Sequence, residues 1–74
     1  MSKLSPEKPY RVIKVLEKQG FKLIRQSGSH GVFRHPDGRW TTVPIHPSKD
    51  VSKGMLRKII KDVGISIEEF NKLK

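Results

Sequence analysis

The chain of 74 residues contains no cysteine, which excludes disulfide bridges and thiolate zinc sites and is compatible with a reducing compartment. It also has no apolar run near the roughly 20 residues that span a bilayer. Polar residues at positions 5–8 stand where a signal peptide would have its apolar core. We therefore expect a cytoplasmic protein with no membrane partner.

Acidic residues are scarce, since 7 Asp and Glu oppose 16 Lys and Arg and give a formal net charge of +9. Small domains more often carry a net charge of about 2 to 8, and a large positive field attracts polyanions. Nucleic acid is the first expected partner and an acidic protein the second. So short a chain builds one thin core, which argues against a large enclosed substrate cavity.

Hydrophobic periodicity and turn residues predict an α+β fold. We expect a flexible lead-in over residues 1–8 and a single domain over 9–74. The expected elements are a helix from Pro9 closed by Gly20, strands over 21–26, 30–35 and 39–45, a helix capped by Ser52 and ended by Gly64, and a short helix from Ile67. Both long helices should cover one face of a three-stranded antiparallel sheet.

Three details of the sheet follow from the sequence. Phe21, Leu23 and Arg25 are expected on one side of the first strand. The Pro36-Asp37-Gly38 stretch predicts a hairpin turn between the second and third strands. Pro44 cannot donate to a ladder, so the third strand should lie at an edge or end there.

The order of several motifs resembles the HicA family of toxin ribonucleases. These motifs are Gly20-Phe21, Arg25-Gln26-x-Gly28-Ser29-His30, Arg34-His35-Pro36-Asp37-Gly38 and Val43-Pro44, followed by a helix ending in Gly64. The resemblance runs roughly from Pro9 to Phe70. It departs at Gly31, where many relatives carry a second histidine or a bulkier residue.

The resemblance implies a double-stranded-RNA-binding-domain-like fold and an mRNA-cleaving toxin of a prokaryotic toxin–antitoxin pair. It also implies a HicB-type antitoxin that covers the active surface, so that the toxin is a monomer when free and a hetero-oligomer when neutralised. The family's active histidine falls on His30, and Gly28 occupies the matching glycine position. No cofactor is implied.

RNA cleavage without a metal needs a base for the 2′-hydroxyl proton and an acid for the leaving oxygen. Imidazole, with an unperturbed pKa near 6.5, serves either role, which suits His30. Positive charge is needed beside the scissile phosphate, and Arg25, Arg34 and Lys53 are candidates. The small turn residues Gly28 and Ser29 would let the RNA backbone approach closely.

The other polar candidates have competing interpretations. His46 is a possible second proton donor, because the end of the third strand could approach the turn, whereas His35 is expected to cap the hairpin. A metal site from these two and His30 matches no zinc spacing. Ser27 or Ser29 as a nucleophile has no carboxylate near it in sequence before Asp37.

A second set of residues is open to two interpretations. Lys53, Arg57 and Lys61 recur at helical spacing and form either a solvated helix face or a set of phosphate contacts. Trp40 and Phe33 could stack on bases, but packing in the core or over the hairpin is the expected role.

Two other functions remain open besides the ribonuclease. One is a non-catalytic double-stranded-RNA-binding module, which would bind duplex RNA without needing His30. The other is a basic protein that acts only as the partner of an acidic protein.

Overall fold

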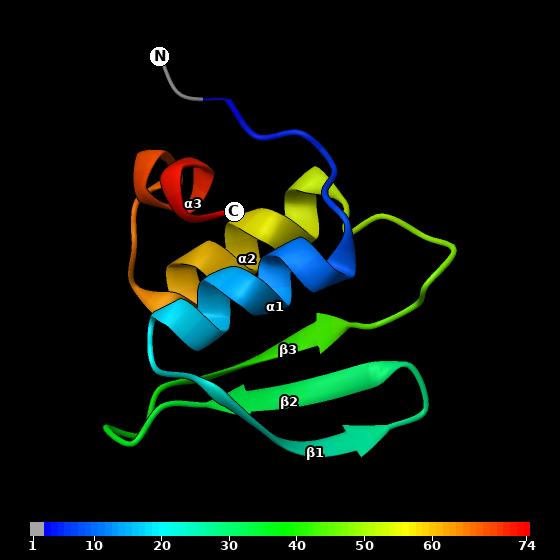
Figure 1. Ribbon diagram of the computed structural model, residues 1–74, viewed down its shortest axis with the longest axis vertical. Helices are drawn as coiled ribbons and strands as arrows, with labels where there is room; N and C mark the ends of the chain where they lie inside the picture. The colour runs from blue at the N-terminus through cyan, green and yellow to red at the C-terminus, as the bar shows by residue number, and fades with distance from the viewer. Residues whose placement is uncertain (1–2) are drawn as a thin grey trace.

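The computed structural model describes residues 3–74, which form three helices and three strands (Figure 1). In chain order they are α1 (Pro9–Lys18), β1 (Lys22–Ser27), β2 (His30–Arg34), β3 (Trp40–Pro44), α2 (Lys53–Val63) and α3 (Ile67–Leu73). The expected element order is confirmed, and the strand bounds differ from the prediction by about one residue.

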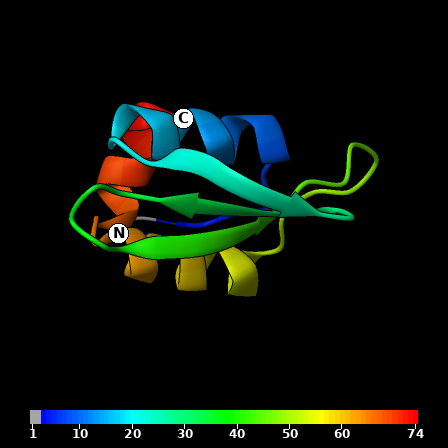
Figure 2. The same ribbon diagram turned by 90° about the horizontal axis from the view of Figure 1, so that it is seen from below.

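The three strands form one antiparallel sheet in the order β1-β2-β3, with β2 in the centre. All the helices lie on one side of this sheet, and no helix covers the other side (Figures 1 and 2). We call the uncovered side the open face. The prediction of an α+β, double-stranded-RNA-binding-domain-like layer is therefore confirmed.

Helix α1 begins and ends where its residues dictate. Pro9 stands in the first turn, where its missing N–H leaves no bond unmade. The N–H of Phe21 bonds the carbonyl of Leu16, and the N–H of Gly20 bonds that of Glu17. This is a Schellman ending, which Gly20 permits with its φ of 90°. The chain therefore turns directly from α1 into β1.

The two later helices begin at side-chain caps, as predicted. The hydroxyl of Ser52 accepts a hydrogen bond from the N–H of Met55 at the start of α2. The hydroxyl of Ser66 does the same for Glu69 at the start of α3. Each cap satisfies one of the backbone donors that a helix leaves free at its first turn.

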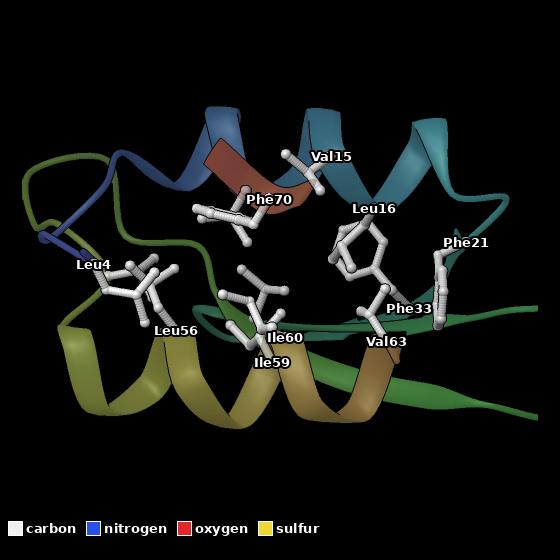
Figure 3. Packing of buried hydrophobic residues seen from close by; sticks show 13 residues of the cluster. Leu4, Val15, Leu16, Phe21, Phe33, Leu56, Ile59, Ile60, Val63 and Phe70 are labelled. Carbon is white, nitrogen blue, oxygen red and sulfur yellow. The ribbon is translucent and has the colours of Figure 1, made fainter. Parts of the chain in front are cut away.

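The core lies between the helices and the covered face of the sheet (Figure 3). Its largest fully buried side chains are Phe21, Phe33 and Phe70, so that β2, α3 and the connection between α1 and β1 each contribute one ring. Thr41 is also fully buried, and its hydroxyl bonds the Asp62 carboxylate at 2.9 Å. That bond fixes the last turn of α2 to β3.

The predicted flexible lead-in instead packs on the domain. Leu4 is part of the core at the Leu56 end of the cluster (Figure 3). Glu7 and Val51 exchange two backbone hydrogen bonds, of 3.0 and 2.7 Å. The domain therefore begins before residue 9, and the first two positions of that lead-in lie outside the described residues.

The predicted facing of β1 is wrong at Arg25. Leu23 lies opposite Phe33, but Arg25 lies opposite Val32, because a β-bulge shifts the register between Leu23 and Arg25. Phe33 faces the core, and its neighbour Val32 faces the opposite side. The bulge therefore moves the Arg25 side chain to the open face.

Within residues 3–74, no helix has both the length and the apolar character that crossing a bilayer requires.

Candidate functional site

The turn between β1 and β2 consists of Gly28 and Ser29 and joins the paired residues Ser27 and His30. Gly28 has a φ of 57°, and no residue other than glycine has a positive φ in the described chain. A two-residue hairpin with positive φ only at its first position is the type II′ pattern, which requires glycine there. The turn thus fixes where β2 begins, and His30 is its first residue.

His30 lies on the open face. Its neighbour Gly31 is buried with Phe33 on the covered face, so the alternation of the strand sends His30 to the other side. The side chain is exposed, and neither ring nitrogen is bonded to any group among residues 3–74. Both nitrogens are therefore available to accept or donate a proton.

The open face around His30 is cationic. Arg25 lies opposite Val32, two residues along β2 from His30, which makes it a diagonal neighbour at a Cβ separation of about 7–8 Å. Arg34 lies four residues after His30 in β2, which is about 13 Å at the rise per residue of a β-strand. Both arginines are exposed and have no ion pair among the described residues. None of the three strands contains a carboxylate.

Gly31 is glycine because Ile45 occupies the space beside it. A Cβ at Gly31 would lie 2.5 Å from the Ile45 side chain, 3.0 Å from Leu23 and 3.2 Å from Phe33. The absence of a side chain at Gly31 thus fits the packing around it. The bulk of Ile45 stands where the side chain of a larger residue would begin.

His46 lies near the turn but is not bonded to His30. The N–H of Ile45 bonds the carbonyl of Ser29, so the pairing of β2 and β3 continues one residue past Pro44. His46 follows directly, and its Nδ1 lies 2.9 Å from the Ser48 hydroxyl. The structure brings the backbone of His46 to the same end of the sheet as His30, without a contact between the rings.

The α2 cations lie elsewhere. Asp62 marks the side of α2 that faces β3, because it bonds Thr41. With 3.6 residues per turn, Lys53 and Arg57 project about 180° and 140° away from Asp62, and Lys61 about 100° away. All three are exposed. Only Lys53 is at the first turn of α2, which points toward the same end of the molecule as the β1–β2 turn (Figure 1).

His35 holds the β2–β3 hairpin, which is the capping role expected from sequence. Its Nδ1 accepts a hydrogen bond from the N–H of Asp37 at 3.1 Å, and its ring packs on Phe21 with centroids 5.3 Å apart. The backbone N–H of Arg39, together with the Arg39 guanidinium and His35, lowers the pKa of Asp37 against the opposing effect of burial. The described residues contain no group of three or more potential metal ligands, so the three histidines do not meet.

Sequence reasoning missed Arg39 in this region. Arg39 bonds the carbonyl of Val63, pairs with Asp37 at 2.8 Å and lies over the Phe21 ring. Trp40 lies opposite Arg34 on the open face with 58% of its surface exposed, so a place in the core, one of its two expected packing roles, is wrong for Trp40 and right for Phe33.

A model of the family described as the HicA toxin of bacterial toxin–antitoxin systems matches residues 10–65 of the 74. The chain belongs to the HicA toxin family. The match includes all of the β1–β2 turn, the three strands and α2. No curated protein matches the chain significantly. As a HicA toxin, the chain has an antitoxin as its general partner.

Proposed function

We propose that this HicA toxin is a metal-independent endoribonuclease that cleaves mRNA in the prokaryotic cytoplasm, with His30 as its general acid/base. The observation that carries the proposal is an exposed imidazole with both nitrogens unbonded on a sheet face without carboxylates. Arg25 is a diagonal neighbour of His30 across the sheet and has no ion pair among the described residues. RNA fits that arrangement, because its phosphates carry negative charge and its 2′-hydroxyl has a proton to give up.

The chemistry follows from these groups. His30 accepts the proton of a 2′-hydroxyl of the RNA while the 2′-oxygen attacks the adjacent phosphorus. The P–O5′ bond breaks, and the leaving oxygen takes a proton, which leaves a 2′,3′-cyclic phosphate and a 5′-hydroxyl. The Arg25 guanidinium balances the charge that accumulates on the non-bridging oxygens, and Arg34 holds the strand further along β2. His46 is a candidate donor to the leaving oxygen.

The test compares the wild-type protein with His30→Ala on a long transcript in the presence of a chelator. We expect the variant to cleave about 10²- to 10⁴-fold more slowly, since proton transfer by a positioned side chain contributes about that much. Lys61→Ala is the matched control, because it removes one exposed cation from a surface away from Arg25. Equal cleavage by wild type and His30→Ala would refute the proposal.

The products provide a second measurement. A substrate with deoxyribose at the cleaved position lacks the nucleophile, so it should resist cleavage, and the wild-type products should end in a cyclic phosphate. Cleavage of the deoxy substrate would exclude attack by the 2′-hydroxyl. His46→Ala in the same assay assigns the second proton, with a loss of similar size expected if His46 is the donor.

The antitoxin proposed for this chain is of the HicB type and covers the open face. The cationic side chains of that face would be opposed by an acidic surface, which would also block RNA. Co-expression with the adjacent reading frame should suppress cleavage and produce a hetero-oligomer. Charge reversal at Arg25 should weaken that complex more than charge reversal at Lys61.

A further inference from the structure

The open face has a hollow at the far end of the sheet from His30. Its volume is about 480 Å³, and it is lined by Ile24, Arg25, Val32, Arg34, Gly38 and Trp40. It lies beside the β2–β3 hairpin, because Gly38 is part of its lining. The β1–β2 turn is at the opposite end of the sheet (Figures 1 and 2). A path from His30 to this hollow runs along β2.

The alternation of β3 puts Trp40 on the open face, where most of its aromatic surface contributes no burial to the core. The adjacent Thr41 is fully buried and fixes β3 to α2, while Trp40 leaves 58% of its surface in solvent. A Trp40 side chain placed for stability would be covered, as Phe33 is with 1% exposed. The indole instead presents apolar surface that no described residue covers fully.

The surroundings of Trp40 select the chemistry of a ligand. Arg34 lies directly opposite in the β2–β3 pair, and Arg25 lines the same hollow. Neither has an anionic partner among residues 3–74, and the strands carry no carboxylate. Nothing lies within 4 Å of where a Cβ of Gly38 would be, so the hairpin leaves that side open. A flat ring joined to phosphates meets all of these conditions.

We propose that this hollow binds an unpaired nucleobase of the RNA, stacked on Trp40, with its flanking phosphates held by Arg25 and Arg34. The proposal rests on the proposed function, because it takes RNA as the ligand. Bases in a duplex are already stacked and paired, so their faces are closed to the indole. The toxin would therefore take single-stranded RNA across the open face, with the stacked base about 13 Å along β2 from His30.

The chain has a single tryptophan, so its fluorescence reports on this hollow alone. The experiment titrates His30→Ala, in which cleavage is expected to be slow, with four ligands. They are a single-stranded RNA of 12 nucleotides, the same sequence as a duplex, an abasic strand of equal length, and polyglutamate. We expect only the single strand with bases to quench Trp40. Equal quenching by the abasic strand or by polyglutamate would overturn the proposal, the latter in favour of an acidic protein as the occupant.

Variants then measure affinity for the same single strand in the His30→Ala background. Trp40→Ala should weaken binding by about 5- to 150-fold, the range found for loss of one stacked base, and Trp40→Phe should restore most of it. Tyr10→Ala is the matched control, because Tyr10 is also exposed, at 65%, and lies on α1. An equal loss in Trp40→Ala and Tyr10→Ala, or none in either, would refute the subsite.

Cleavage assays on the wild-type protein and on Trp40→Ala with His30 intact separate the nuclease proposal from the subsite proposal. Cleavage that depends on His30 but is unchanged by Trp40→Ala would leave the nuclease standing and overturn the subsite. No cleavage, together with quenching by the single strand, would refute the nuclease and support the subsite as a binding site.

Discussion

At the residue scale, Gly31 follows His30 in β2 and packs beside the Ile45 side chain. Gly31→Ala places a methyl group 2.5 Å from the Ile45 side chain. We expect a loss of about 1 kcal/mol in the free energy of unfolding, the lower end for overpacked cores, because Cδ1 is the end of a flexible side chain that can shift. Denaturation in urea, followed by circular dichroism, would measure it.

The double variant Gly31→Ala/Ile45→Val is the control for that prediction. Valine lacks the Cδ1 atom that the new methyl group would meet, so the two changes should couple favourably by about 0.5 kcal/mol or more. Strict additivity would show that Ile45 is not the obstacle. Gly28→Ala makes a contrasting case, since its Cβ meets nothing within 4 Å and only its φ of 57° opposes the change.

The sequence was informative about individual residues only in part. His30 was identifiable because the Gly-Ser-His order carries a family resemblance. Trp40 was not, because alternation shows that Trp40 and Thr41 face opposite sides but not which side is covered. Thr41 is the buried one through its bond to Asp62, 21 residues away, and that long-range contact is invisible in the local pattern.

At the element scale, Arg39 joins the β2–β3 hairpin to the end of α2. Its guanidinium donates to the carbonyl of Val63, one of the acceptors that a helix leaves free at its C-terminus. Arg39→Ala should reduce the free energy of unfolding by about 1.5 kcal/mol, the lower end for a bond from a charged donor. Thermal denaturation would report the loss.

Arg57→Ala is the control for this prediction, because Arg57 is exposed and has no ion pair among the described residues. It should change stability by less than about 0.5 kcal/mol. A similar loss in both variants would indicate a general effect of charge rather than the link between hairpin and helix.

Helices were more predictable than strands for physical reasons. The caps at Ser52, Gly64 and Ser66 act within a few residues, so local sequence defines the ends of α2 and α3. The facing of β1 depends on its pairing with β2, and the bulge before Arg25 is visible only in that pairing. Helix-scale signals are local, while sheet register is set between strands.

At the scale of the whole molecule, a nearly buried ion pair connects the N-terminal segment to the last helix. The Glu7 carboxylate accepts a hydrogen bond from Lys74 Nζ at 2.8 Å, and Arg11 lies 3.7 Å away. Burial alone would raise the pKa of Glu7, but Lys74, the backbone N–H of Lys8 and Arg11 together lower it below its ordinary value.

A carboxyl with a lowered pKa in the folded state stabilises that state only while ionised. The contribution of Glu7 is complete above its ordinary value of 4.5 and is lost as the pH falls through the lowered one. Glu7→Gln should therefore be less stable than wild type at pH 7, and the difference should shrink toward pH 3. Glu17→Gln, at an exposed carboxylate of α1, is the control. A gap that stays constant with pH would contradict this account.

The position of β2 between two strands has a consequence for the free toxin. β2 is paired on both sides, whereas β1 is exposed at all six positions and has only β2 as a neighbour. In heavy water, β2 should keep its amide protons longest, while the amides on the outer edge of β1 exchange for deuterium rapidly. A partner that added a strand at that edge would slow their exchange, so the same spectrum would show how the antitoxin attaches.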